Sequence, residues 1–252
     1  MDKLFVFDLD DTLIDNVHDY AKPILNACGL IIQTLGSRAP HVSKLIAIEQ
    51  EIDKHRIKEI NPDTNKPYLY SMERFPSSLV ETYREICQPA RITPKPEIEE
   101  ELYNIGLQAF NEDQYVKNTK PHTLSTLDFL REQGDTLMLC SKGDKRVQGK
   151  KLSALKSEGI DHFSKIIVVD DKTPDNFKKL SKGFTRCQRY SIGNSYTSDI
   201  IPALEAGFKG IYIPVETWET VGKMDEIQAE IDKEECFIFR SLKSIQTQYE
   251  KL

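Results

Sequence analysis

The feature that most constrains the fold is an alternation of short, apolar runs with amphipathic stretches. The first run, residues 4–7 (LFVF), contains no polar residue, which is typical of a strand buried on both faces of a sheet. Similar short runs lie at residues 136–140, 166–169, 190–193, 210–213 and 236–239. Amphipathic stretches lie between them, at residues 123–131, 147–155, 199–206 and 224–231. Because strands alternate with helices, the chain is predicted to form an α/β fold with a doubly wound parallel sheet and helices on both faces.

The stretch from residue 16 to residue 120 interrupts this alternation. It has no strand-like run as pure as the first, and its patterned segments have helical spacing. These segments are residues 19–35, 42–58, 79–87 and 97–110, and loops with turn residues separate them at 60–67 and 89–96. We therefore expect a core domain made of residues 1–15 and 121–252, and an inserted α-helical domain made of residues 16–120.

Composition narrows the classes of partner. The net charge is −6, so the chain has no bulk attraction for nucleic acid or for anionic membranes. Its apolar runs are far shorter than the ~18 residues that a membrane span needs, and charged residues near the N-terminus leave no room for a secretory signal. The five cysteines are scattered and form no CxxC pair, which is typical of reduced thiols. We expect a cytoplasmic protein without nucleic-acid or membrane partners.

The most informative stretch is FDLDDTL, which follows the first predicted strand. It places the carboxylates of Asp8 and Asp10 at the carboxyl end of a buried strand, where open α/β sheets have their binding sites. Paired carboxylates there suit divalent-metal binding together with acid–base or nucleophilic chemistry. The alternative is a solvated strand end in which Asp10 or Asp11 is a turn or capping residue.

This stretch resembles the first motif, DxDx(T/V), of the haloacid dehalogenase (HAD) superfamily. Three further motifs of that superfamily follow in the expected order: Ser141 after a strand, Lys172 before a predicted helix start, and the run GNSYTSD at residues 193–199. The resemblance covers the core, residues 3–15 and 120–214, whereas the inserted helices match only in position and type. It implies a Rossmann-like core with an α-helical cap inserted between the first and second motifs.

The resemblance also implies a role for each acid of the first motif. Asp8 would be the nucleophile that becomes an aspartyl phosphate. Asp10 would be the general acid that protonates the leaving alkoxide and then activates water. Thr12 would hydrogen-bond near this loop, steady Asp10 and take part in substrate binding. Dehalogenases of the superfamily lack the second acid, so Asp10 favours a phosphatase or a phosphomutase.

Two residues are implied to stabilise the transferring phosphoryl group. Ser141 would donate a hydrogen bond to it, although a Ser between a strand and a helix is often only an N-cap. Lys172 would neutralise its charge. Lys142 and Gly143 are assigned to substrate binding, with a solvated lysine as the alternative for Lys142. The other lysines nearby are expected mostly on solvated faces: Lys150, Lys151, Lys178, Lys179 and Lys182.

The fourth motif departs from the common pattern of the superfamily. Asn194 stands where an Asp is usual, and a neutral amide ligates a cation without contributing charge. The resemblance implies a Mg²⁺ site made of the Asp8 carboxylate, the Asp10 carbonyl, Asn194 or Asp199, and water. Alternatively, Asn194 is an ordinary turn residue.

These observations predict a Mg²⁺-dependent phosphomonoester hydrolase that acts on a small phosphate ester. The departure at Asn194 leaves open a catalytically weak or inactive HAD-fold protein with a binding or regulatory role. A phosphomutase would need the same residues, and a dehalogenase would leave Asp10 without a role. The sequence gives no indication of substrate identity or oligomeric state.

Overall fold

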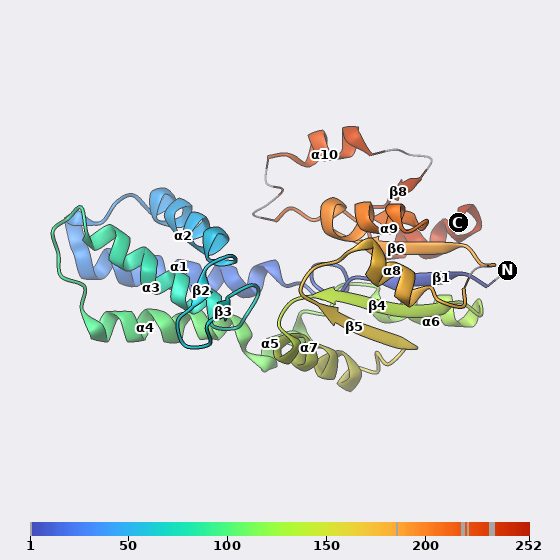
Figure 1. The fold of residues 1–252 in the computed structure, drawn as a ribbon, viewed down its shortest axis with the longest axis horizontal. Helices are drawn as coiled ribbons and strands as arrows, with labels where there is room; N and C mark the ends of the chain where they lie inside the picture. Colours follow the sequence, from blue (N-terminus) through green and yellow to red (C-terminus); the bar gives the residue numbers. More distant parts are fainter. Residues whose placement is uncertain (1, 185, 218–219, 221, 232–234) are drawn as a thin grey trace. The chain divides into compact units, whose positions relative to one another are not determined.

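A sheet of six parallel strands organises the larger of the two units into which the chain divides. The strand order is β5-β4-β1-β6-β7-β8 (Figure 1). The strands are β1 (Leu4–Phe7), β4 (Thr136–Lys142), β5 (Lys165–Val169), β6 (Arg189–Gly193), β7 (Lys209–Tyr212) and β8 (Cys236–Ile238). Strand β1 lies at the centre, with Phe7 in register with Leu139 on one side and Ile192 on the other. The predicted parallel α/β sheet is thereby confirmed.

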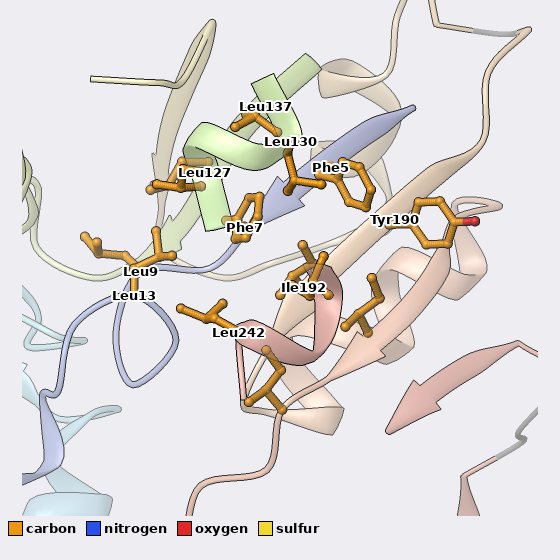
Figure 2. Packing of buried hydrophobic residues seen from close by; sticks show 14 of the residues in the cluster. Phe5, Phe7, Leu9, Leu13, Leu127, Leu130, Leu137, Tyr190, Ile192 and Leu242 are labelled. Atoms are coloured by element: carbon orange, nitrogen blue, oxygen red, sulfur yellow. The ribbon is translucent and has the colours of Figure 1, made fainter. Parts of the chain in front are cut away.

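Helices pack on both faces of this sheet. The helices of the unit are α6 (Thr123–Glu132), α7 (Lys145–Ser157), α8 (Pro174–Leu180), α9 (Ile201–Glu205), α10 (Met224–Glu230) and α11 (Lys243–Thr247). Alternate side chains of β1 point to opposite faces. Phe5 and Phe7 pack with residues of α6, α7 and α11 (Figure 2), whereas Leu4 and Val6 pack with residues of α8 and α9. A strand buried on both faces explains the unbroken apolar run of the sequence.

The structure is a computed structural model that describes residues 2–184, 186–217, 220, 222–231 and 235–252. Unit 1 comprises residues 1–16 and 115–252, and unit 2 comprises residues 17–114. The second boundary falls inside the short helix α5 (Glu112–Lys117), upstream of the boundary expected at residue 120.

Unit 2 is mainly helical. Its elements are α1 (Val17–Leu35), α2 (Val42–Arg56), the strands β2 (Ile60–Asn61) and β3 (Lys66–Pro67), α3 (Arg74–Cys87) and α4 (Pro96–Leu107). Short 3₁₀ turns follow α1 and α4. The ring of Tyr20 on α1 packs edge-to-face against Phe75 on α3 and against Phe110, with centroid distances of 4.9 and 6.0 Å. Aromatic packing of this kind holds α1 against α3.

Several local predictions were wrong. Residues 60–67, predicted as a loop, contain the antiparallel pair β2–β3. Helix α3 begins at Arg74 rather than at residue 79, and residues 199–206 divide into a π-helical turn (Tyr196–Ile200) and α9. Helices α5 and α11 were not anticipated, because each has too few residues to show a helical period, whereas α8 begins where a helix start was predicted after Lys172. Within the described part of the chain, no helix combines the length and apolarity that a membrane crossing requires.

Candidate active site at the carboxyl end of the sheet

The predicted motifs meet because four neighbouring strands end at the same edge of the sheet. Asp8 follows β1, Ser141 and Lys142 end β4, Lys172 lies three residues beyond β5, and Asn194 follows β6. The order β5-β4-β1-β6 places these strand ends side by side. Parallel sheets of this type bind ligands at the carboxyl ends of their strands.

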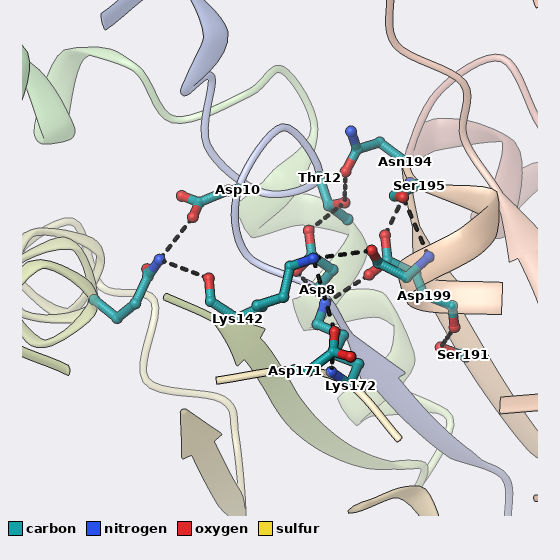
Figure 3. Close-up of polar contacts among 12 residues, drawn as sticks. Asp8, Asp10, Thr12, Lys142, Asp171, Lys172, Ser191, Asn194, Ser195 and Asp199 are labelled. Atoms are coloured by element: carbon teal, nitrogen blue, oxygen red, sulfur yellow. Dashed lines mark hydrogen bonds and ion pairs between the residues drawn. The ribbon is translucent and has the colours of Figure 1, made fainter. Parts of the chain in front are cut away.

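A buried lysine joins two carboxylates at the centre of this edge (Figure 3). The Lys172 ammonium donates to Asp8 Oδ1 and to Asp199 Oδ1, the latter at 2.6 Å. The side chains of Lys172 and Asp199 are each 3% exposed and that of Asp8 is 9% exposed. Three charged groups buried together need mutual pairing to be stable. The sequence-predicted Asp8, Lys172 and Asp199 therefore form one cluster.

The glycine of the fourth motif makes room for this cluster. A Cβ atom on Gly193 would lie 2.2 Å from Asp199 Oδ2, closer than real side chains approach. That same oxygen accepts a hydrogen bond from the Ser195 backbone N–H at 2.9 Å. The π-helical turn that follows carries Asp199 back against the end of β6. Gly193 is thus required by the position of the Asp199 carboxylate.

Burial and neighbouring charge shift the pKa values of the cluster. Burial raises the pKa of the Asp8 carboxyl and the Asp199 charge raises it further. Lys172 offsets only part of this, so the pKa of Asp8 lies at about 7. Burial lowers the pKa of the Lys172 ammonium, but the carboxylates of Asp199 and Asp8 outweigh burial and hold that pKa above its usual value. Lys172 therefore remains a cation at neutral pH.

Thr12 links the first and fourth motifs. Its hydroxyl lies 3.1 Å from Asp8 Oδ2 and 3.3 Å from Asn194 Oδ1. The hydroxyl carries a single hydrogen, whereas both neighbours are acceptor oxygens. The carboxylate oxygen of Asp8 and the amide oxygen of Asn194 therefore lie near the same hydroxyl, which can donate its hydrogen to only one of them at a time.

Asp10 lies apart from this cluster. Figure 3 shows its carboxylate turned away from Asp8. Its Oδ1 accepts from the Lys151 ammonium and its Oδ2 from Gln148 Nε2, each at 2.7 Å. Lys151, expected among the solvated lysines, is buried, so that expectation was wrong. A signal was present in the sequence: Gln148, Lys151 and Leu155 share one helical face, and Leu155 belongs to the core.

The remaining predicted residues lie at the end of β4. The Ser141 hydroxyl is buried and has no hydrogen-bond partner among the described residues. Lys142 reaches across the sheet edge, with its Nζ 3.2 Å from Ser198 Oγ and 3.9 Å from Asp171 Oδ1. The backbone N–H of Gly143 donates to the Val169 carbonyl at 3.1 Å. The Ser141 hydroxyl is therefore able to donate a hydrogen bond to a bound group.

Few of the described side chains at this site are suited to ligate a metal ion. No group of three or more His, Cys, Asp or Glu side chains that could hold a metal ion occurs within the described ranges. Mg²⁺ is commonly bound by one or two carboxylates with several waters, so a full protein cage is unnecessary. Asp8 Oδ2 and Asn194 Oδ1, which both lie near the Thr12 hydroxyl, are oxygens of the type that such a cation takes as ligands.

Comparisons with known proteins bear on the fold. No family model and no curated protein matches the sequence. A haloacid dehalogenase-like family hydrolase from Xanthomonas campestris superposes with a TM-score of 0.68 at 20% identity, over 99% of this chain and 91% of that one. The chain has the haloacid dehalogenase-like fold.

Two further structures with this fold illustrate its range. YfnB from Bacillus subtilis, described as an HAD-hydrolase bound to magnesium, matches with a TM-score of 0.56 at 16% identity, over 98% of this chain and 97% of that one. The L-2-haloacid dehalogenase from Xanthobacter autotrophicus, with chloropropionic acid covalently bound, matches with a TM-score of 0.54 at 15% identity over the full length of both chains. Other matches are described as phosphatases. The haloacid dehalogenase-like fold thus leaves the reaction to be argued from the site.

Proposed function

We propose that this protein is a Mg²⁺-dependent phosphomonoester hydrolase that acts on a small phosphorylated metabolite through an aspartyl-phosphate intermediate. The observation that carries the proposal is the buried Asp8–Lys172–Asp199 cluster at the edge of the sheet where β4 ends in Ser141, whose hydroxyl has no hydrogen-bond partner among the described residues. A carboxylate fixed by a lysine is a positioned nucleophile, and a hydroxyl without a partner is a donor for an incoming oxygen.

The charge of the cluster supports a metal requirement. With Asp8 ionised, as its attack on phosphorus requires, two carboxylates and one ammonium sum to one negative charge. A phosphate ester is itself an anion, so the site needs further positive charge to bind it. A divalent cation held by Asp8 Oδ2 and Asn194 Oδ1 would supply that charge and would use the spare acceptors around Thr12.

The residues divide the reaction into two displacements. Asp8 attacks phosphorus, the bond from phosphorus to the ester oxygen breaks, and the departing alkoxide takes a proton from Asp10. Water then attacks the phosphorus of the aspartyl phosphate and gives a proton to Asp10, which releases Asp8 and inorganic phosphate. Lys172 and Ser141 stabilise the charge on the phosphoryl oxygens in both steps.

Asp10 separates this proposal from the dehalogenase reaction. Halide leaves without a proton, so that reaction has no use for a second acid at this position. A phosphomutase would use the same residues. A binding or regulatory protein that retains the fold is the candidate favoured by the amide of Asn194, which brings no charge to the metal site.

A panel of sugar phosphates, nucleotides and small phospho-acids tests the proposal, with phosphate release measured with and without Mg²⁺. We expect release that requires Mg²⁺ and that falls by roughly 10³-fold or more in Asp8→Asn. Asp175→Asn is the matched control, because that carboxylate lies on the surface of unit 1. Equal rates for the wild type and Asp8→Asn would overturn the hydrolase assignment, and halide release from a haloacid would replace it with a dehalogenase.

A further inference from the structure

Lys151 is a buried cation that the two displacements above do not use. Its side chain is 3% exposed. Its ammonium donates to Asp10 Oδ1 at 2.7 Å and to Asn16 Oδ1 at 2.6 Å. A lysine in the interior loses its hydration and is stable there only with partners of this kind. Its burial therefore depends on the Asp10 carboxylate.

Gln148 holds the same carboxylate from one helical turn away. Its Nε2 donates to Asp10 Oδ2 at 2.7 Å and lies 3.3 Å from the Lys142 carbonyl oxygen. Gly143 leaves space for it, since a Cβ there would lie 2.6 Å from that nitrogen. Both oxygens of Asp10 are thus engaged from one face of α7, which restricts the carboxylate to one orientation.

Lys151 also interacts with the two residues of unit 1 that border unit 2 in the sequence. Asn16 is the last residue of unit 1 before the chain enters unit 2, and Tyr115 is the first residue after it returns. The Lys151 ammonium lies 5.5 Å from the centroid of the Tyr115 ring. The backbone N–H of Asn16 donates to Asp11 Oδ1 at 2.8 Å, which fixes Asn16 against the first motif.

We propose that Lys151 is a positioning residue for Asp10, and that Asn16 and Gln148 complete the set that orients it. This inference rests on the proposed function, in which Asp10 transfers the proton to and from the reacting oxygens. A general acid works only within hydrogen-bond distance of the leaving oxygen. In an in-line displacement that oxygen departs on the side of phosphorus opposite Asp8, so a carboxylate held away from Asp8 can meet it, and the groups that hold the carboxylate control the proton-transfer step. Lys151 itself does not touch the reacting atoms.

The test compares two esters that differ in their need for a proton. An alkyl phosphate releases a strongly basic alkoxide, whereas p-nitrophenyl phosphate releases a stable phenolate that leaves without help. For Lys151→Met we expect kcat on the alkyl ester to fall by ~30-fold or more, a substantial part of a general-acid contribution. We expect kcat on the aryl ester to fall by less than about threefold, with KM little changed for both.

Further variants separate positioning from a structural role. Lys156→Met makes the same change at an exposed site on α7 and should leave both rates unchanged. Gln148→Met, which keeps the buried cation, and Asn16→Ala should show smaller losses of the same selectivity. Lys151→Arg should recover part of the alkyl-ester rate, and Lys151→Met added to Asp10→Asn should cause no further loss.

The outcomes distinguish the two proposals. Equal loss on both esters in Lys151→Met and in Gln148→Met would overturn the positioning role while leaving the hydrolase assignment intact. A wild type inactive on every ester would overturn the hydrolase assignment, and the positioning role would fall with it. If Lys151→Met does not fold, the ratio of the two rates in Gln148→Met and Lys151→Arg decides, since unchanged ratios there contradict the proposal.

Discussion

Each unit buries a cluster of two carboxylates and one cation. In unit 1 the members are Asp8, Asp199 and Lys172, and in unit 2 they are Glu49, Asp53 and Arg74. A serine hydroxyl accompanies each cluster. That of Ser78 in unit 2 donates to Asp53 Oδ1 at 3.0 Å, whereas that of Ser141 in unit 1 has no partner within the described ranges.

A comparison of the two clusters shows that a raised carboxyl pKa does not by itself mark a functional site. Burial, with the Asp53 charge, raises the pKa of Glu49 to about 8, and Arg74 offsets only part of this. That shift resembles the one at Asp8, where burial and Asp199 raise the pKa to about 7. The unit 2 cluster lies among packed helices, whereas the unit 1 cluster lies at the edge of the sheet where four parallel strands end. Location distinguishes the two, since a buried donor without a partner among the described residues, Arg74 Nε, occurs in the unit 2 cluster as well.

The largest expected effect comes from removing each buried cation. Lys172→Met leaves two carboxylates facing each other and should lower hydrolysis by ~10³-fold or more and the free energy of unfolding by ~3–5 kcal/mol. Arg74→Met should destabilise unit 2 by a similar ~3–5 kcal/mol while the folded protein keeps most of its activity. Denaturant unfolding and phosphate release measure both. A large loss of kcat in folded Arg74→Met would break the comparison.

Glu49 gives unit 2 a distinctive pH dependence. Its pKa is raised in the folded state, so the folded protein binds more protons than the unfolded chain between the usual glutamate pKa and about 8. The free energy of unfolding should therefore fall as the pH rises through this window, in total by on the order of 5 kcal/mol. Glu49→Gln should remove that slope. Urea unfolding between pH 5 and about 8.5 measures it.

Glu51→Gln is the control, since it makes the same change on an exposed face of α2. It should leave the slope as in the wild type. A wild-type slope retained in Glu49→Gln would show that another group titrates.

Two glycines of unit 1 sharpen the contrast between a crowded and an open position. Gly193→Ala forces a Cβ against the Asp199 carboxylate and should cost ~1–3 kcal/mol together with a large part of the activity. Gly149 lies in α7 with nothing within 4 Å of its Cβ position. Gly149→Ala should therefore stabilise the protein by ~0.5–1 kcal/mol. Thermal unfolding and activity of the two variants provide the comparison, and tolerance of Gly193→Ala in both assays would contradict the close approach of Asp199.

The smallest effect is expected at an exposed ion pair of unit 2. Arg84 donates to both oxygens of Glu99 at 2.7 and 2.8 Å, but its side chain is 49% exposed. Arg84→Met should lower the free energy of unfolding by only ~0.5 kcal/mol because water screens the pair. A cost as large as that of Arg74→Met in denaturant unfolding would show that burial is not what separates the two arginines.

Much of the fold followed from local pattern. The apolar runs located the six strands of the main sheet, most directly the central strand β1, which is buried on both faces and is therefore apolar throughout. Short helices such as α11 escaped prediction, since five residues give too few turns for a period to appear. The hairpin β2–β3 escaped because strands of two residues carry no alternation.

The candidate site was likewise predictable from the sequence only in part. The sequence by itself determined that Asp8, Ser141, Lys172 and Asn194 would meet, since each lies at or shortly after the end of a strand and parallel strands end at a common edge. Only the tertiary structure decided the direction of the Asp10 carboxylate, whereas the helical face shared with Leu155 already favoured Lys151 over Lys150 as a buried residue. Adjacent lysines on a helix have the same chemistry, and their fates differ only through the surface against which each face packs.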